Sequence, residues 1–145
     1  MIKEPPLVLY AEDNRLWALA VIDTLELLGC RVEHLSCGTM ALVVLRCAKD
    51  RGRHYDLIVL DNDLPSMSGL EVTRQARQMP EWQRTPIILM ALEDCTEAAL
   101  EAGADELLRK PNNLVTFADA VRRLLSASRE RQKAQGGGER QKAGE

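Results

Sequence analysis

The stretch "YDLIVLDNDLPSMSG" (Tyr55–Gly69) contains a short apolar run that leads into two aspartates, Asp61 and Asp63. The four residues before Asp61 are apolar without interruption, a pattern typical of a strand covered on both faces in a parallel sheet. Carboxylates at the end of such a strand repel each other and resist losing water. Other parts of the chain must therefore account for their position.

Four further segments have the character of strands. Residues 7–11 (LVLYA) and 87–92 (IILMAL) are apolar throughout, whereas residues 31–35 (RVEHL) and 106–110 (ELLRK) are weaker candidates. Residues 31–35 mix polar and apolar side chains, which favours an edge strand. Helical segments with apolar stripes alternate with the strands, at residues 14–29, 39–51, 68–79, 95–102 and 113–129. This alternation predicts an α/β fold with an open parallel sheet and helices on both faces.

The composition is that of one folded domain. The chain has 145 residues, is 46% hydrophobic and 28% charged, and carries a formal net charge of -3. It lacks the basic excess typical of a nucleic-acid-binding protein, and its apolar runs are much shorter than the ~20 residues of a membrane-spanning helix. We therefore expect neither direct nucleic-acid binding nor a membrane location.

Histidine and cysteine are sparse and scattered. The four cysteines form no CxxC pair, and His34 and His54 lie far from any such pair, so a zinc site is not expected. Both histidines are predicted to be exposed and without a role. The N-terminus has no signal-peptide pattern. Free thiols and the missing signal favour a cytoplasmic protein.

The sequence changes character near its C-terminus. Residues 129–145 (RERQKAQGGGERQKAGE) are almost devoid of apolar side chains and include a triple glycine. Such a segment cannot offset the entropy lost on ordering. We predict one domain over residues 5–128, followed by the frayed end of a helix and a flexible polar tail over residues 129–145.

Acidic side chains follow two of the predicted strands. Glu12 and Asp13 come after the first strand, Asp61 ends the third, and Lys110 ends the fifth. In open α/β sheets, ligands bind at the carboxyl ends of the strands, so these groups share a pocket if strands one and three are neighbours. Mg²⁺ prefers one or two carboxylates together with water and phosphate oxygens. The cluster therefore predicts a magnesium site beside an aspartate that can attack a phosphoryl group, with Lys110 neutralising charge.

Three motifs resemble those of the receiver domains of two-component response regulators. They are "ED" at residues 12–13, "DLIVLDNDLPSMSGLEV" at residues 56–72 and "AGADELLRKP" at residues 102–111. The resemblance covers about residues 5–128. It implies a flavodoxin-like, doubly wound, five-stranded parallel sheet with strand order 2-1-3-4-5. It also implies a phosphoprotein of a two-component phosphorelay.

The resemblance assigns a role to each candidate residue. Asp61 would be the phosphoacceptor for a sensor histidine kinase or a phosphotransfer protein, and Lys110 would contact the phosphoryl group. Glu12, Asp13 and Asp61, with the backbone carbonyl of Asp63, would bind Mg²⁺. The protein would then be a signalling phosphoacceptor that assists its own phosphorylation and dephosphorylation, and not an enzyme.

Two positions depart from the family's pattern. Ala91 stands where receivers usually carry a Thr or Ser that bonds a phosphoryl oxygen, and Leu107 stands at the aromatic switch position. One hydrogen bond contributes roughly 0.5–1.5 kcal/mol, which is enough to alter a modest population shift. Leu92, which follows Ala91, is expected to narrow access to Asp61. We predict magnesium-dependent phosphorylation with a weak or unconventional structural response.

Two other functions remain open. A pseudo-receiver, which is a binding module that is not phosphorylated, is favoured by Ala91 and Leu107 but not by the acidic residues and Lys110. A phosphatase of the haloacid-dehalogenase type is suggested by Asp61-x-Asp63 after an apolar strand. That motif normally follows the first strand, however, and no cap is evident in so short a chain.

Partners are less well defined by the sequence. The last predicted helix has a charged flank (Asp119, Arg122 and Arg123) that, with Arg109, is a candidate surface for a partner or a homodimer. An ordinary solvated face is the simpler interpretation. Because no output module follows residue 128, we expect a complete protein of this length to signal by binding another protein. The resemblance also implies a cis peptide bond before Pro111.

Overall fold

The computed structural model of the chain describes residues 4–110 and 113–143, with side chains up to residue 134. The predicted cis peptide bond before Pro111 lies outside these residues. The chain forms a five-stranded parallel sheet of order β2-β1-β3-β4-β5, so the predicted strand order is confirmed. Its strands are β1 (Leu7–Ala11), β2 (Arg31–Leu35), β3 (Leu57–Asp61), β4 (Ile87–Ala91) and β5 (Glu106–Arg109).

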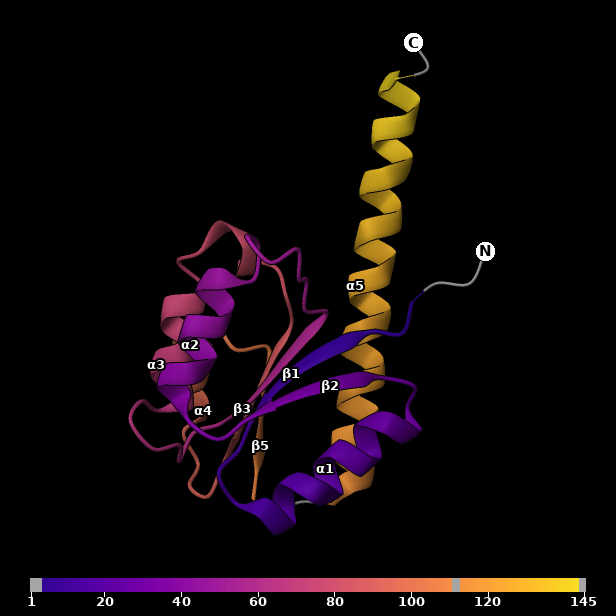
Figure 1. Cartoon of the computed structure of the whole chain (residues 1–145). Helices are drawn as coiled ribbons and strands as arrows, with labels where there is room; N and C mark the ends of the chain where they lie inside the picture. The colour runs from indigo at the N-terminus through magenta and orange to yellow at the C-terminus, as the bar shows by residue number, and fades with distance from the viewer. Residues whose placement is uncertain (1–3, 111–112, 144–145) are drawn as a thin grey trace.

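Helices cover both faces of this sheet, as predicted (Figure 1). Helices α1 and α5 lie on one face, and α2, α3 and α4 lie on the other. A short 3-10 helix, η1 (Pro80–Trp82), precedes β4. The helices are α1 (Arg15–Leu27), α2 (Gly38–Cys47), α3 (Gly69–Ala76), α4 (Thr96–Ala102) and α5 (Leu114–Ala143).

The strands supply both halves of the core because their side chains alternate between the two faces. Leu7 and Leu9 of β1 pack toward α2, α3 and α4. Val8 and Tyr10, which alternate with them along β1, pack toward α1 and α5. All residues of β1, β3 and β4 are buried, which explains why these segments are apolar apart from Asp61 at the end of β3. The weaker β2 lies at the edge, as its mixed composition predicted.

Helix α5 is much longer than the other helices. It ends at Ala143 and extends beyond residue 128, where the tail was predicted to begin; the far end of the helix stands clear of the sheet (Figure 1). The division into a domain over residues 5–128 and a flexible tail stays a prediction. Among the helices in the described ranges, none combines the length and apolar character that a membrane crossing requires.

The N-terminus of α2 contacts the loop that follows β3. The Gly38 N–H donates a hydrogen bond to the Pro65 carbonyl at 3.2 Å. A Cβ atom at Gly38 would lie 1.9 Å from the carbonyl oxygen of Met67, so glycine is needed for this approach. Ser66, in the same loop, has a φ of 69° and is hydrogen-bonded to Thr39. Helix α2 therefore helps to position the loop after Asp61.

Gly38→Ala is expected to destabilise the fold, because a methyl group at this position overlaps the Met67 carbonyl. Overpacking of this kind costs about 1–3 kcal/mol, to be measured as the free energy of unfolding in urea. Met40→Ala is the matched control, since Met40 is 48% exposed on the same helix, and a change below about 0.5 kcal/mol is expected. Equal effects of the two variants would contradict the close approach.

Candidate functional site

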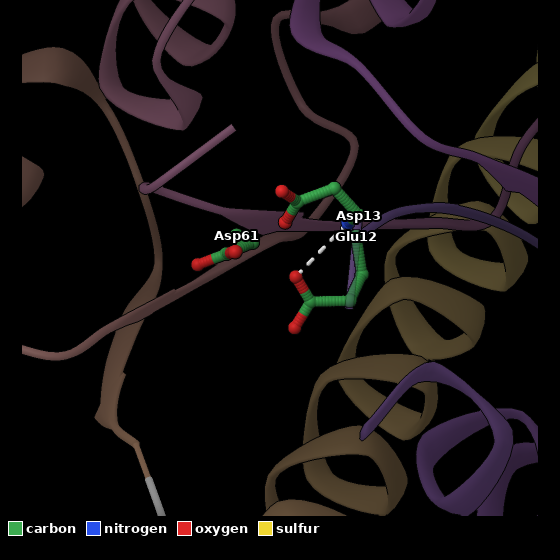
Figure 2. A group of neighbouring side chains, drawn as sticks. All are labelled: Glu12, Asp13 and Asp61. Atoms are coloured by element: carbon green, nitrogen blue, oxygen red, sulfur yellow. Dashed lines mark hydrogen bonds between the residues drawn. The ribbon is translucent and has the colours of Figure 1, made fainter. Parts of the chain in front are cut away.

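The pairing of β1 with β3 brings the predicted acidic residues together. Ala11 lies beside Leu60 in the parallel register, so the residues that follow β1 lie next to Asp61 at the end of β3. One carboxylate oxygen from each of Glu12, Asp13 and Asp61 lies within 4.8 Å of the other two. Figure 2 shows the three side chains gathered at this edge of the sheet. The expectation that they share one pocket is therefore confirmed.

Two of these carboxylates are buried beside a single ammonium group. Glu12 is 1% exposed and Asp61 is 2% exposed, whereas Asp13 is exposed to solvent. The Lys110 Nζ atom lies 2.6 Å from Glu12 Oε1 and 3.2 Å from Asp61 Oδ2. The lysine thus enters the pocket as predicted. Three carboxylates face one ammonium group, which leaves an excess of negative charge.

The excess negative charge shifts the pKa values of residues in the pocket. Burial and the neighbouring Asp61 carboxylate raise the pKa of Glu12, Lys110 opposes the rise, and the net result is a pKa of about 7. Burial by itself lowers the pKa of Lys110, but the bond to Glu12 and the charge of Asp61 outweigh burial and raise it. Burial, with the charges of Glu12 and Asp61, also raises the pKa of Tyr10. A cation would relieve this excess.

Hydrogen bonds between backbone and side-chain groups hold the loop after Asp61. The Asp63 N–H donates to Asp61 Oδ1 at 3.2 Å. The Asn62 N–H donates to the Met90 carbonyl at 2.8 Å, and Asn62 Oδ1 accepts from the Leu70 N–H at 3.1 Å. These contacts tie the loop to β4 and to the first turn of α3. The role of the Asp63 backbone carbonyl as a metal ligand stays a prediction.

A cleft of about 330 Å³ opens beside the carboxylates. The Trp17 ring lies at this cleft, with its centroid 5.9 Å from Lys110 Nζ, although the sequence analysis did not single Trp17 out. Leu92 is 56% exposed and also lines the cleft. The full lining consists of Asp13, Asn14, Trp17, Asp61, Asp63, Leu92 and Lys110.

His34, which was predicted to be exposed and without a role, also makes a contact near the site. It is exposed, as expected, but its Nε2 atom lies 2.8 Å from the carbonyl oxygen of Glu12. The expectation that His34 has no role stays a prediction, although the sequence did not indicate this hydrogen bond. Its contact depends on the parallel pairing of β1 with β2, in which Tyr10 lies beside His34. The residues around His34 in the sequence do not predict which residue of β1 lies beside it.

The two positions predicted to act in a switch lie on neighbouring strands. Ala91 ends β4 and is buried, and Leu107 of β5 packs against the core on the side of α2, α3 and α4. The loop after β4 is tied down by other groups. Arg109 donates two hydrogen bonds to the Leu92 carbonyl, at 3.1 and 3.0 Å, and the Leu92 N–H approaches Asp63 Oδ2 at 3.4 Å.

The charged flank of α5 makes contacts within the chain. Arg123 pairs with Glu106 at 3.0 Å, and Arg122 pairs with Asp119 at 3.2 Å. These exposed pairs agree with the simpler interpretation of a solvated face. The homodimer or partner surface stays a prediction.

The donor set suits Mg²⁺. All three side chains offer carboxylate oxygens, which are the hard ligands that Mg²⁺ prefers. The exposed Asp13 and the adjoining cleft leave room for water or phosphate oxygens, which complete most magnesium sites in proteins. Burial of two carboxylates with a single ammonium group supplies the electrostatic driving force for binding a cation.

The family model of the response regulator receiver domain matches residues 8–122. The chain belongs to this family. It is similar to the response regulator ArlR of Staphylococcus aureus, with 39% identity over 80 residues, which are 53% of this chain and 35% of ArlR. The match thus spans about a third of the length of that relative.

Solved receiver structures support the same assignment. The receiver domain of a signal transduction histidine kinase from Syntrophus aciditrophicus has 30% identity and a TM-score of 0.75, over 84% of this chain and 91% of that domain. The receiver domain of a sensor histidine kinase from Pseudomonas aeruginosa PAO1 has 26% identity and a TM-score of 0.74, over 84% of this chain and 98% of that domain. The latter structure has a magnesium ion coordinated in its active site cleft.

The family assignment decides between some of the alternatives. Receiver domains are signalling phosphoacceptors of two-component systems rather than conventional enzymes, and they interact with histidine kinases. The resemblance seen in the sequence is confirmed. The assignment argues against the phosphatase, and Asp61 ends β3 rather than the first strand.

Glu12→Gln tests the charge excess in the metal-free protein. Because the pKa of Glu12 is about 7 in the folded chain and lower in the unfolded chain, the folded state binds this proton more tightly. The stabilisation is complete at pH values below the unfolded pKa and is lost as the pH rises through about 7. We expect Glu12→Gln to weaken this decline and to raise Tm near pH 8 by on the order of 5 °C.

Thermal unfolding in a chelator, at pH values from about 5 to about 8, measures this effect. Glu26→Gln on α1 is the control because Glu26 is exposed, and it should leave the pH profile unchanged. A lower Tm for Glu12→Gln than for wild type near pH 8 would show that the carboxylate is stabilising.

Proposed function

We propose that this receiver domain accepts a phosphoryl group from a histidine kinase, or from a phosphotransfer protein, onto Asp61 in a magnesium-dependent reaction. The observation that carries this proposal is the position of Asp61. Its carboxylate is buried at the end of β3, lies 3.2 Å from Lys110 Nζ, and shares a pocket with the oxygens of Glu12 and Asp13.

Glu12, Asp13 and Asp61, with the backbone carbonyl of Asp63, would hold the magnesium ion. When bound, Mg²⁺ would neutralise charge on the phosphoryl oxygens. The orientation of the Glu12 carboxylate is already fixed for this role, because Oε2 accepts a hydrogen bond from the Asp13 N–H at 3.1 Å and Oε1 accepts one from Lys110. The magnesium ion in the Pseudomonas aeruginosa receiver domain supports the proposal.

In the proposed transfer, a carboxylate oxygen of Asp61 attacks the phosphorus of a phosphohistidine. The new O–P bond forms as the P–N bond breaks, and the imidazole leaves with the electron pair of that bond. The Asp63 N–H orients Asp61 through Oδ1. Lys110 lies on the side of Oδ2, where it can balance the charge of the transferred group.

The structural response to phosphorylation is proposed to be weak or unconventional. Ala91 offers no hydroxyl to draw the loop after β4 toward a phosphoryl oxygen, and Leu107 is not aromatic. Arg109 already holds that loop through two hydrogen bonds to the Leu92 carbonyl. Output through contacts with another protein and a cytoplasmic location are parts of the same proposal.

Asp61→Asn tests the phosphoacceptor by intact mass after incubation with a small phosphodonor such as acetyl phosphate. We expect wild type to gain one phosphoryl group in the presence of Mg²⁺, and to gain little in a chelator. The Asp61→Asn variant should gain none, because an amide oxygen is a poor nucleophile. Asp63→Asn is the matched control and should keep the gain, since the one hydrogen bond of its side chain within the described residues is the 3.4 Å contact with the Leu92 N–H.

The alternatives give different results in the same assay. A pseudo-receiver would show no mass gain in wild type, and an equal gain in Asp61→Asn would place the modification elsewhere. Turnover of para-nitrophenyl phosphate that requires both Asp61 and Asp63 would instead indicate a phosphatase.

Ala91→Thr tests the proposed response of the loop. Hydrogen exchange of residues 92–103 is expected to change little when wild type is phosphorylated. The threonine variant adds a hydrogen bond of roughly 0.5–1.5 kcal/mol to the phosphoryl group. The population in which the loop after β4 is drawn toward that group should therefore rise by about fivefold on phosphorylation, and hydrogen exchange of the loop should slow. Ala91→Val is the control because valine has the same shape without the hydroxyl. All samples are compared at equal phosphorylation, as measured by intact mass, and equal responses in Thr and Val variants would contradict the proposal.

A further inference from the structure

His34 makes a contact that the phosphoryl-transfer chemistry does not use. It lies near the end of β2, and its Nε2 atom is 2.8 Å from the Glu12 carbonyl oxygen. A carbonyl oxygen only accepts hydrogen bonds, so Nε2 must carry the proton and donate it. The bond therefore links the end of β2 to the backbone of a proposed metal ligand.

This bond acts on one peptide group with two ends. The Glu12 carbonyl and the Asp13 N–H belong to the same planar peptide, and in a trans peptide they point in opposite directions. The Asp13 N–H donates to Oε2 of Glu12 at 3.1 Å, which is the dashed line in Figure 2. Anchoring the carbonyl on the side of β2 therefore directs the N–H toward the Glu12 carboxylate.

Other contacts leave the Glu12 carboxylate little freedom once this peptide is oriented. The Glu12 N–H donates to the Leu35 carbonyl at 2.9 Å, so the end of β2 holds both polar backbone groups of Glu12. At the side chain, Oε2 accepts from the Asp13 N–H and Oε1 accepts from Lys110 at 2.6 Å. If the bond to His34 is removed, the peptide can rotate and Oε2 loses its aligned donor.

We propose that His34 is a positioning residue, whose Nε2–H orients the Glu12–Asp13 peptide and thereby the Glu12 carboxylate toward the metal position. The part that concerns Mg²⁺ rests on the proposed function. Groups that orient metal ligands without touching the metal typically change affinity by about 10- to 100-fold when they are lost.

His34 also packs on Tyr10, with ring centroids 5.5 Å apart and planes tilted by 33°. Two substitutions separate packing from hydrogen bonding. His34→Phe keeps an aromatic ring against Tyr10 but has no donor, and His34→Gln removes the ring but keeps an N–H donor near the position of Nε2. A packing role predicts that phenylalanine preserves the site, whereas the positioning role predicts that glutamine does.

Magnesium affinity is the first readout. It is measured by titration with Mg²⁺ through the fluorescence of Trp17, which lines the cleft. Trp17→Phe should abolish the signal, because the remaining Trp82 is buried and bonded to Leu45 away from the cleft. We expect His34→Phe to raise the Kd for Mg²⁺ by about tenfold or more, and His34→Gln to remain close to wild type.

The amide resonance of Asp13 in metal-free protein is the second readout. Loss of its hydrogen bond should shift the amide proton upfield in His34→Phe, while His34→Gln keeps the wild-type position. A wild-type shift in His34→Phe, or equal upfield shifts in both variants, would overturn the positioning role. If wild type binds no Mg²⁺, the proposed function fails, and the Asp13 resonance still decides whether His34 orients the peptide.

Discussion

The burial of two carboxylates beside a third, with one ammonium group among them, is the constraint on which the site depends. Parallel pairing of β1 with β3 places Ala11 beside Leu60, so the acids that follow each strand must meet at one edge of the sheet. Burial then raises the pKa of Glu12 to about 7. A fold that keeps such charge out of water gives up stability in exchange for a pocket that attracts a cation.

The geometry of that pocket is set largely by backbone groups outside it. The end of β2 holds the Glu12 peptide from one side through His34 and Leu35. On the other side, a Cβ at Gly69 would lie 2.5 Å from the Asp61 carbonyl oxygen, so α3 approaches the end of β3 as closely as glycine permits. Neighbouring strand ends and one helix N-terminus thus orient the carboxylates, and rigid elements of this kind suit a binding site that needs a fixed geometry.

The acidic residues and the two predicted switch positions come from different strands of the sheet. Glu12 and Asp13 follow β1 and Asp61 ends β3, whereas Ala91 and Leu107 lie on β4 and β5. A side chain can therefore change at the switch positions without removing a carboxylate from the pocket. In this chain the loop after β4 is tied by Arg109 to Leu92, a contact that does not require a hydroxyl at position 91.

Much of the architecture and part of the site followed from the sequence alone. Continuous apolar runs located β1, β3 and β4, because strands buried on both faces have no polar positions. Carboxyl ends of parallel strands share one edge, so Glu12, Asp13, Asp61 and Lys110 could be assigned to one pocket before any distance was known. Only the tertiary structure revealed the contacts of His34 with Glu12, of Trp17 with Lys110 and of Arg109 with Leu92. Each of these joins different elements, and its geometry depends on strand register and side-chain direction, which local periodicity does not encode.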